Sequence, residues 1–121
     1  MLDTRFGRSR RLVTKLGFKT VFDDATYKIS HRNLLILARK NGLNRPRLGM
    51  VIAKKNIKFA VDRNRVKRVV RETFRLNQQV VEELDIVFLA RRGLDKLDSS
   101  AQNKVLIDSW RKLSRQVAQS K

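Results

Sequence analysis

Residues 62–76 read DRNRVKRVVRETFRL, and the spacing of apolar residues in this stretch predicts an amphipathic α-helix. At about 100° per residue, the apolar side of such a helix collects Val66, Val69, Val70, Thr73, Phe74 and Leu76. The other side collects Arg63, Asn64, Lys67, Arg68, Arg71 and Arg75. We expect the helix over about 62–78, with Asp62 as its N-cap, to bury the apolar side and expose the basic one.

The basic side of this helix indicates phosphate binding. A solvated helix face usually mixes charges of both signs, but here only Asp62 and Glu72 relieve the repulsion between the cations. Arginine outnumbers lysine, and its planar fork suits bidentate phosphate contacts and stacking on exposed bases, which favours RNA. Asn64 could bond a base edge or a sugar hydroxyl, or it could cap the helix, and the spacing leaves both open.

The rest of the chain predicts one further helix on each side and four strands. We expect a helix over 15–22 capped by Thr14, strands over 27–30, 33–39, 47–54 and 85–91, and a final helix capped by residues 98–100. In 47–54, Leu48, Met50 and Ile52 alternate with the smaller Gly49, Val51 and Ala53. The final helix carries a core stripe of Val105 or Leu106, Trp110, Leu113 and Val117. The predicted order is α-β-β-β-α-β-α in a single domain, 1–121, with a basic N-terminal arm of about 1–13 and a short tail of about 118–121.

Composition restricts the function. Of 121 residues, 29 are Lys or Arg and 11 are Asp or Glu, which gives a net charge of +18 and calls for a polyanionic partner. The charge is interleaved with apolar segments, so the folded surface itself is expected to be basic, and nucleic acid is favoured over an anionic membrane. With no Cys and with His31 alone, thiolate or paired-histidine metal sites and most nucleophile–histidine catalysis are excluded.

Other candidates are open to two interpretations. Phe18 and Phe22 lie four residues apart, so they could fill the core or stack on unpaired bases, and spacing alone favours the core. Asp23 and Asp24 lack the third acidic partner that a two-metal nuclease site needs. Two pairs of cations at predicted strand ends are auxiliary phosphate contacts or solvated ends: Lys54 and Lys55, and Arg91 and Arg92.

The longest apolar runs are far shorter than a membrane span. Residues 34–38 and 86–90 form runs of five, whereas a spanning helix needs about 20. The N-terminus is basic and lacks the apolar segment of a secretory signal. We therefore expect a cytoplasmic protein with no membrane partner.

Residues 63–75 resemble the signature helix of the bacterial ribonuclease P protein subunit. The resemblance extends to RLGMVIAKKN at 47–56, to Arg11-Leu12, to the pair Phe18 and Phe22, and to DIVFLAR at 85–91. It covers nearly the whole chain and is more specific than a generic basic run.

The resemblance implies an α+β fold, a two-layer α/β sandwich. Its four-stranded sheet would contain a left-handed β-α-β crossover, as in a domain of a ribosomal small-subunit protein. It also implies a protein that joins a catalytic RNA in removing the 5′ leader from precursor tRNA, an endonuclease reaction that the RNA performs with Mg²⁺. No catalytic residue, no tightly held metal and no obligate protein partner are then expected of the chain itself.

Carried over by position, the resemblance implies two sites. Arg63, Asn64, Lys67, Arg68 and Arg71 would contact the catalytic RNA, and Arg75, on the same side of the helix, is expected to contact it as well. The leader would lie in a cleft formed by Phe18, Phe22, Leu35, Leu37, Val51 and Ala53. Some relatives have an aromatic residue at the position of Leu37 and small hydroxyls at those of Val51 and Ala53, so this more apolar cleft should depend less on base identity.

Two other classes of protein remain as alternatives. A structural ribosomal-type protein would bind ribosomal RNA through the same basic helix and would have no leader cleft. A helix-in-groove DNA-binding protein would recognise duplex bases, usually as a dimer, and the sequence shows no obvious dimer seam.

Overall fold

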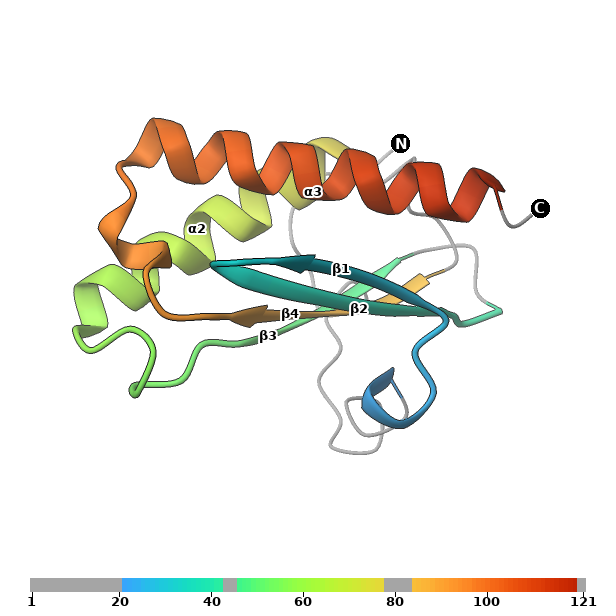
Figure 1. The fold of residues 1–121 in the computed structure, drawn as a ribbon, viewed down its shortest axis with the longest axis horizontal. Coiled ribbons are helices and arrows are strands. Elements are labelled where there is room, and N and C mark those ends of the chain that lie inside the picture. The colour runs from blue at the N-terminus through green and yellow to red at the C-terminus, as the bar shows by residue number, and fades with distance from the viewer. Residues whose placement is uncertain (1–20, 43–45, 78–83, 120–121) are drawn as a thin grey trace, which may run out of the picture.

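The computed structural model describes residues 21–42, 46–77 and 84–119, which form a sheet layer and a helix layer (Figure 1). The strands are β1 (Tyr27–His31), β2 (Leu34–Lys40), β3 (Arg47–Val51) and β4 (Leu84–Ala90). The helices are α2 (Ala60–Asn77), the short 3-10 helix η3 (Leu94–Lys96) and α3 (Ser99–Gln119). The α+β sandwich and the predicted order from the first strand onward are confirmed.

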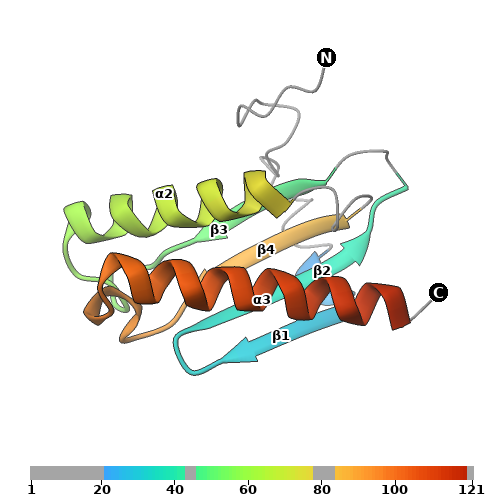
Figure 2. The ribbon, with the colours of Figure 1, turned by 90° about the horizontal axis from the view of Figure 1, so that it is seen from above.

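The strand order in the sheet is β1-β2-β4-β3. β1 and β2 form an antiparallel hairpin, and β4 pairs antiparallel with β2 and parallel with β3. Figure 2 views the sheet from the side of the helices, so α2 lies in front of it. In this view β3 and β4 both point to the left and β4 lies below β3, which places β4 on the left-hand side of an observer who looks along β3. The β3-α2-β4 connection is therefore left-handed, against the strong right-handed preference of such crossovers.

Both helices pack on the same face of the sheet and form the main core with it (Figures 1 and 2). Strand residues alternate between the two faces, so Leu34, Ile36 and Ala38 of β2 point toward the helices. Trp110 of α3 is fully buried, with its ring edge-on to Phe74 of α2 at 5.6 Å between centroids. Four residues of the predicted α3 stripe are buried, with Leu106 rather than Val105 among them.

A hydroxyl links the two helices inside this core. Trp110 Nε1 donates to Thr73 Oγ1 at 2.9 Å, and that hydroxyl donates in turn to the Val69 carbonyl at 2.8 Å. The indole N–H is therefore satisfied although it lies away from water. Thr73 on the apolar side of α2 thus has a specific polar partner.

Several predicted boundaries are wrong by a few residues. α2 begins at Ala60, and the Phe59 carbonyl accepts the backbone N–H groups of Asp62 and Arg63, so Asp62 lies inside the first turn and is not the N-cap. β3 ends at Val51 instead of continuing to 54, because the chain turns at Ala53. The Ala53 carbonyl accepts the backbone N–H groups of Asn56 and Ile57. Local turn bonds override the alternating pattern there.

Three other local predictions have different outcomes. The Asp98 cap is confirmed, since its Oδ1 accepts the N–H of Ala101 at 2.8 Å. Leu76 was expected on the buried side, but it is 73% exposed because it lies at the edge of the apolar arc in the last turn of α2. The predicted first helix is described only at residues 21–23, so Phe18 and the N-terminal arm lie outside the described residues, as do 120–121 of the tail.

Candidate nucleic-acid interface

The exposed side of α2 carries the predicted basic face. Asn64, Arg68 and Arg71 are exposed and Lys67 is half-buried. Asn64 lies in the second turn of a helix that begins at Ala60, so the capping interpretation of this residue is wrong and its amide stands among the cations. We call these four residues, Asn64, Lys67, Arg68 and Arg71, the α2 ridge.

Three other arginines of α2 are engaged within the protein. Arg63 Nη1 donates to the carbonyls of Ile57 and Lys58 at 3.0 and 2.8 Å, which ties the segment before α2 to the helix. Arg65 pairs with Asp62 at 3.2 Å, and Arg75 pairs with Glu72. Since guanidinium has five N–H donors, Arg63 and Arg75 keep donors for a phosphate, but each already has a structural role.

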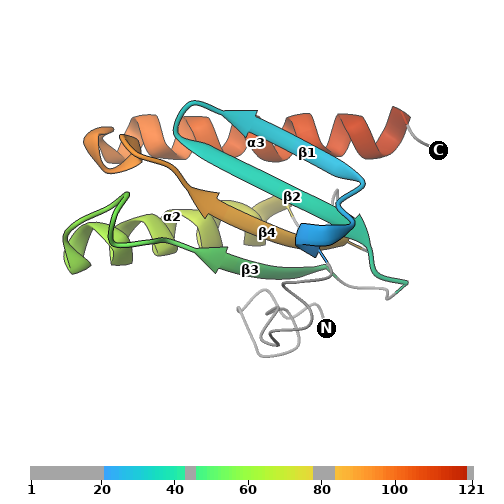
Figure 3. The ribbon, with the colours of Figure 1, turned by 60° about the horizontal axis from the view of Figure 1, so that its bottom comes forward.

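The face of the sheet away from the helices carries the predicted cleft strands (Figure 3). Leu37 lies beside Val87 and Leu35 beside Leu89, in the register of β2 with β4. Val51 of β3 also pairs with Leu89, so the apolar side chains form a strip across three strands. We call this surface the open face.

The segment at residues 21–23 lies over the open face (Figure 3). Val21 is fully buried against Leu37 and Val87, so Leu37 is largely covered and contacts protein. Phe22, next to Val21, is 45% exposed, and Leu35 and Val51 are half-buried. The exposed part of the strip is therefore centred on Leu35, Val51 and Leu89, and Ala53 lies just beyond the end of β3.

An ion pair between Arg47 and Asp85 lies at one end of the open face. Asp85 accepts from Arg47 through two bonds, Nε to Oδ1 at 2.7 Å and Nη2 to Oδ2 at 2.6 Å, and from Asn41 Nδ2 at 2.9 Å. The hydrogen bond with Asp85 raises the pKa of Arg47 above its usual value. Since the carboxylate is paired in this way, it adds no free negative charge to the open face.

The predicted strand-end cations lie in different environments. Lys54 and Lys55 are exposed in the turn after β3, and Arg92 is exposed after β4. Arg91, by contrast, is half-buried, and its Nη1 donates to the Ser30 hydroxyl at 3.0 Å and to the His31 carbonyl at 2.8 Å. Arg91 therefore joins β4 to the β1–β2 turn.

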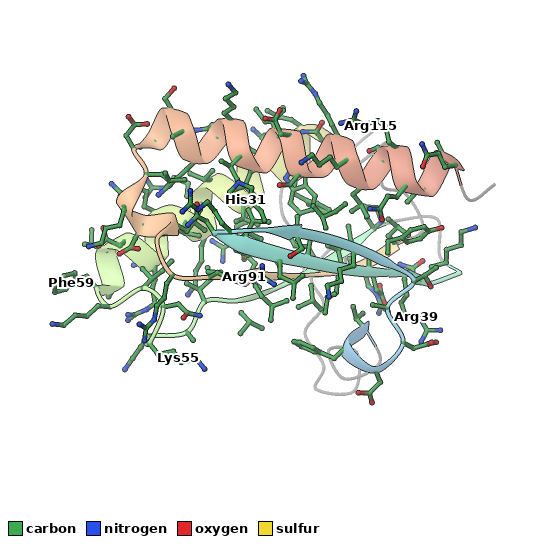
Figure 4. All side chains as sticks on the ribbon, in the orientation of Figure 1. His31, Arg39, Lys55, Phe59, Arg91 and Arg115 are labelled. Carbon is green, nitrogen blue, oxygen red and sulfur yellow. The ribbon has the colours of Figure 1, made fainter. Side chains whose placement is uncertain are left out.

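Sequence reasoning missed Phe59, an exposed aromatic residue at the start of α2 (Figure 4). Its side chain is 58% exposed, and Lys58 Nζ lies 5.4 Å from the ring centroid, a cation–π contact. The signal was a single aromatic residue directly after the lysine-rich run at 54–58. Such a ring beside cations is suited to stacking on an unpaired base.

The α2 ridge and the open face meet at one edge of the molecule. α2 lies above β3, the edge strand, and the residues between them carry Lys54, Lys55 and Lys58 (Figure 2). A polyanion could therefore contact both surfaces around a single basic edge.

Within the part of the chain that the structure describes, no three His, Asp or Glu side chains lie close enough together to hold a metal ion. Asp24 forms an ion pair with Arg39 at 3.3 Å. No helix in the same described ranges is long and apolar enough to cross a membrane.

The fold and these surfaces define a small α+β nucleic-acid-binding protein. A family model described as Ribonuclease P matches residues 6–114. A ribonuclease P protein component of Pseudomonas putida (strain F1) is 50% identical over 115 residues, which is 95% of this chain and 86% of that protein. One from Pseudomonas aeruginosa (strain PAO1) is 46% identical over 115 residues, or 95% and 85% of the two chains.

Solved structures agree with the sequence comparison. The RNase P protein from Thermotoga maritima superposes with a TM-score of 0.69 at 33% identity, covering 84% of this chain and 96% of that one. The Staphylococcus aureus RNase P protein superposes with a TM-score of 0.73 at 21% identity, over 89% and 94% of the chains, which supports the fold alone. The chain belongs to the ribonuclease P protein family.

The Asp85–Arg47 pair should stabilise the fold far more than an exposed pair does. We expect Asp85→Asn to lower the free energy of unfolding by about 1.5–3 kcal/mol, because it removes charge-assisted hydrogen bonds from a nearly buried site. Urea denaturation followed by fluorescence of Trp110, the only tryptophan, measures this loss. As a matched control, Asp24→Asn breaks the ion pair of a carboxylate that is 76% exposed and should cost less than about 1 kcal/mol. Equal losses in the two variants would contradict the prediction.

Proposed function

We propose that this chain is the protein subunit of a ribonuclease P, which removes the 5′ leader from precursor tRNA together with a catalytic RNA. Family membership and the names of its relatives support this assignment. One observation supports a binding role for the protein: it has two separate surfaces, the α2 ridge and the open face, which are joined at one basic edge. The chain supplies binding, and the chemistry belongs to the RNA.

The α2 ridge is the surface for the catalytic RNA. Its exposed guanidinium groups and Lys67 match a phosphate backbone, and the Asn64 amide can bond a base edge or a 2′-hydroxyl. Arg63 and Arg75 flank the ridge, and their bonds to loop carbonyls and to Glu72 limit their freedom to follow a ligand. The ridge therefore contributes position and affinity, both dependent on salt.

The open face is the surface for the single-stranded leader. The strip of Leu35, Leu89 and Val51 offers apolar contact to unpaired bases, and exposed Phe22, next to the covering residue Val21, offers a ring. Hydrogen-bonding groups that could read base identity are sparse on this strip. Leader binding should therefore depend more on length and charge than on sequence.

We expect Mg²⁺ to be held mainly by the RNA. When bound there, Mg²⁺ supplies an activated water and charge stabilisation for hydrolysis of the phosphodiester. The chain contributes by lowering the electrostatic repulsion between the two RNAs, since its charge is +18.

Cleavage of precursor tRNA by the catalytic RNA tests this function. The RNA is assayed at low Mg²⁺ with the protein, without it, and against protein alone. We expect stimulation that requires the RNA. Cleavage by the protein alone would overturn the assignment of chemistry to the RNA, and no stimulation by folded protein with a matched RNA would favour a structural ribosomal-type role.

Loss of one ridge cation should weaken assembly in a salt-dependent way. We expect Arg68→Ala to reduce affinity for the catalytic RNA and to lower the slope of log K against log salt by about 0.7–0.9, because one phosphate contact is lost. Filter binding or fluorescence anisotropy over a range of KCl concentrations measures both. Arg111→Ala, at an exposed cation of α3, is the control and should leave the slope unchanged. A slope unchanged in Arg68→Ala would count against the ridge.

Phe22 should discriminate between leader-bearing and mature tRNA. We expect Phe22→Ala to weaken holoenzyme binding of precursor tRNA by about 1–3 kcal/mol, the range for one stacked base, and to leave mature tRNA binding unchanged. Phe22→Trp, which keeps an aromatic ring, should retain the preference for leader-bearing over mature tRNA. The control is Leu76→Ala, which truncates an exposed apolar residue at the far end of α2. Equal loss for both RNAs in Phe22→Ala would point to a packing role.

A further inference from the structure

A basic groove lies apart from the α2 ridge and the open face. It forms where the β1–β2 turn, the turn after β4 and the first turns of α3 meet, and its volume is about 740 Å³. Each of these segments contributes one exposed cation: Arg32, Arg92 and Lys104. His31, at the end of β1, also lines the groove and lies between the sheet and α3 (Figure 4).

The two turns that form the groove are tied directly to each other. Asn33 Nδ2 donates to the Arg92 carbonyl at 3.0 Å, and the Asn33 carbonyl accepts the Arg91 N–H at 2.9 Å. Gly93 has φ 95°, a backbone conformation that favours glycine, and a Cβ atom there would lie 2.7 Å from Asn33 Nδ2 and displace this amide. Arg32 and Arg92 therefore extend from turns of fixed relative position.

The α3 wall of the groove is also fixed. Gln102 Nε2 donates to the carbonyls of Leu94 and Leu97 at 3.0 and 3.2 Å, which holds the first turns of α3 against the segment after β4. Lys104 follows two residues later on α3. Leu97 and Val105 add an apolar surface beside the cations.

No acidic side chain among the described residues that line the groove neutralises its cations. Nearby Asp98 is committed to capping α3 through Ala101. At the other end of the sheet, by contrast, Arg47 and Arg39 each have a carboxylate partner. Holding three cations together on fixed segments is unfavourable until an anion binds between them.

The imidazole of His31 adds a directed donor. Its Nδ1 accepts the backbone N–H of Asn33 at 3.0 Å. The proton of the neutral ring is therefore on Nε2, which can donate to an anion.

We propose that this groove binds one nucleotide of an RNA strand, with its phosphate among Arg32, Arg92 and Lys104 and its sugar or base against Leu97 and Val105. The inference rests on the proposed function for the identity of the polyanion. The phosphodiester belongs either to the catalytic RNA or to the precursor tRNA, and the two arms of the test below distinguish these sources.

The binding test compares groove cations with equally exposed cations elsewhere. The groove variant is Arg32→Gln/Lys104→Gln, and the charge-matched control is Lys112→Gln/Arg115→Gln, farther along α3 (Figure 4). One arm measures affinity for the catalytic RNA over a range of salt, and the other measures affinity of the assembled holoenzyme for precursor tRNA. In the arm whose RNA occupies the groove, we expect weaker binding and a salt slope lowered by roughly 1.5 for two lost contacts.

The outcomes separate this proposal from the proposed function. A change confined to the catalytic-RNA arm, or to the precursor arm, identifies the source of the nucleotide and supports the site. If the groove variant equals its control in both arms while Arg68→Ala still weakens assembly, the groove proposal is overturned and the function stands. If the unmodified protein neither binds nor stimulates the RNA, the function itself fails.

A second readout does not depend on assembly. His31 is the only histidine, so its ring signals in a proton–carbon NMR spectrum need no assignment by mutagenesis. We expect the 5′-phosphorylated dinucleotide pUpU to shift these signals saturably in the unmodified protein and in the Lys112→Gln/Arg115→Gln control. The shift should be lost in Arg32→Gln/Lys104→Gln. A shift that persists in the groove variant, or one absent from the unmodified protein, would overturn the site.

Discussion

The position of β4 between β2 and β3 is the constraint on which the rest of the structure depends. β4 pairs along its whole length with β2 and in parallel with β3, so both its edges are hydrogen-bonded and all its residues except Leu89 are buried. A parallel partner requires a crossover, and α2 provides it on the same face as α3. Among the residues that the structure describes, the other face of the sheet is covered by the segment at residues 21–23, through Val21.

Charge is distributed over this frame in two ways. At one end of the open face, Arg47 and Asp85 neutralise each other through two hydrogen bonds, which allows a carboxylate to be nearly buried. At the groove beside α3, by contrast, Arg32, Arg92 and Lys104 are exposed, and none of the described residues that line the groove is acidic. Neutralised pairs stabilise the fold, whereas unneutralised cations are available to a polyanion.

The same residue types therefore have different roles according to their neighbours. Arg63 and Arg91 hold loops by donating to backbone carbonyls, although the sequence groups them with other cations as phosphate contacts. Arg68 and Arg92 are exposed and make the stronger candidates for RNA. Family membership makes an RNA partner the natural explanation of this division, and the fold places the basic ridge and the strip of open strands around one edge.

The sequence by itself determined the elements from the first strand onward, the apolar and basic sides of α2, the Asp98 cap and the family, because periodicity, capping and motif are local properties. It misjudged the start of α2, which depends on turn bonds to the Phe59 carbonyl, and the exposure of Leu76, which lies at the edge of the apolar arc. Only the tertiary structure decided that Val21 covers Leu37 and that residues around 32, 92 and 104 form one groove. These contacts join segments far apart in the chain, and their geometry is set by strand order and crossover hand, which no local pattern encodes.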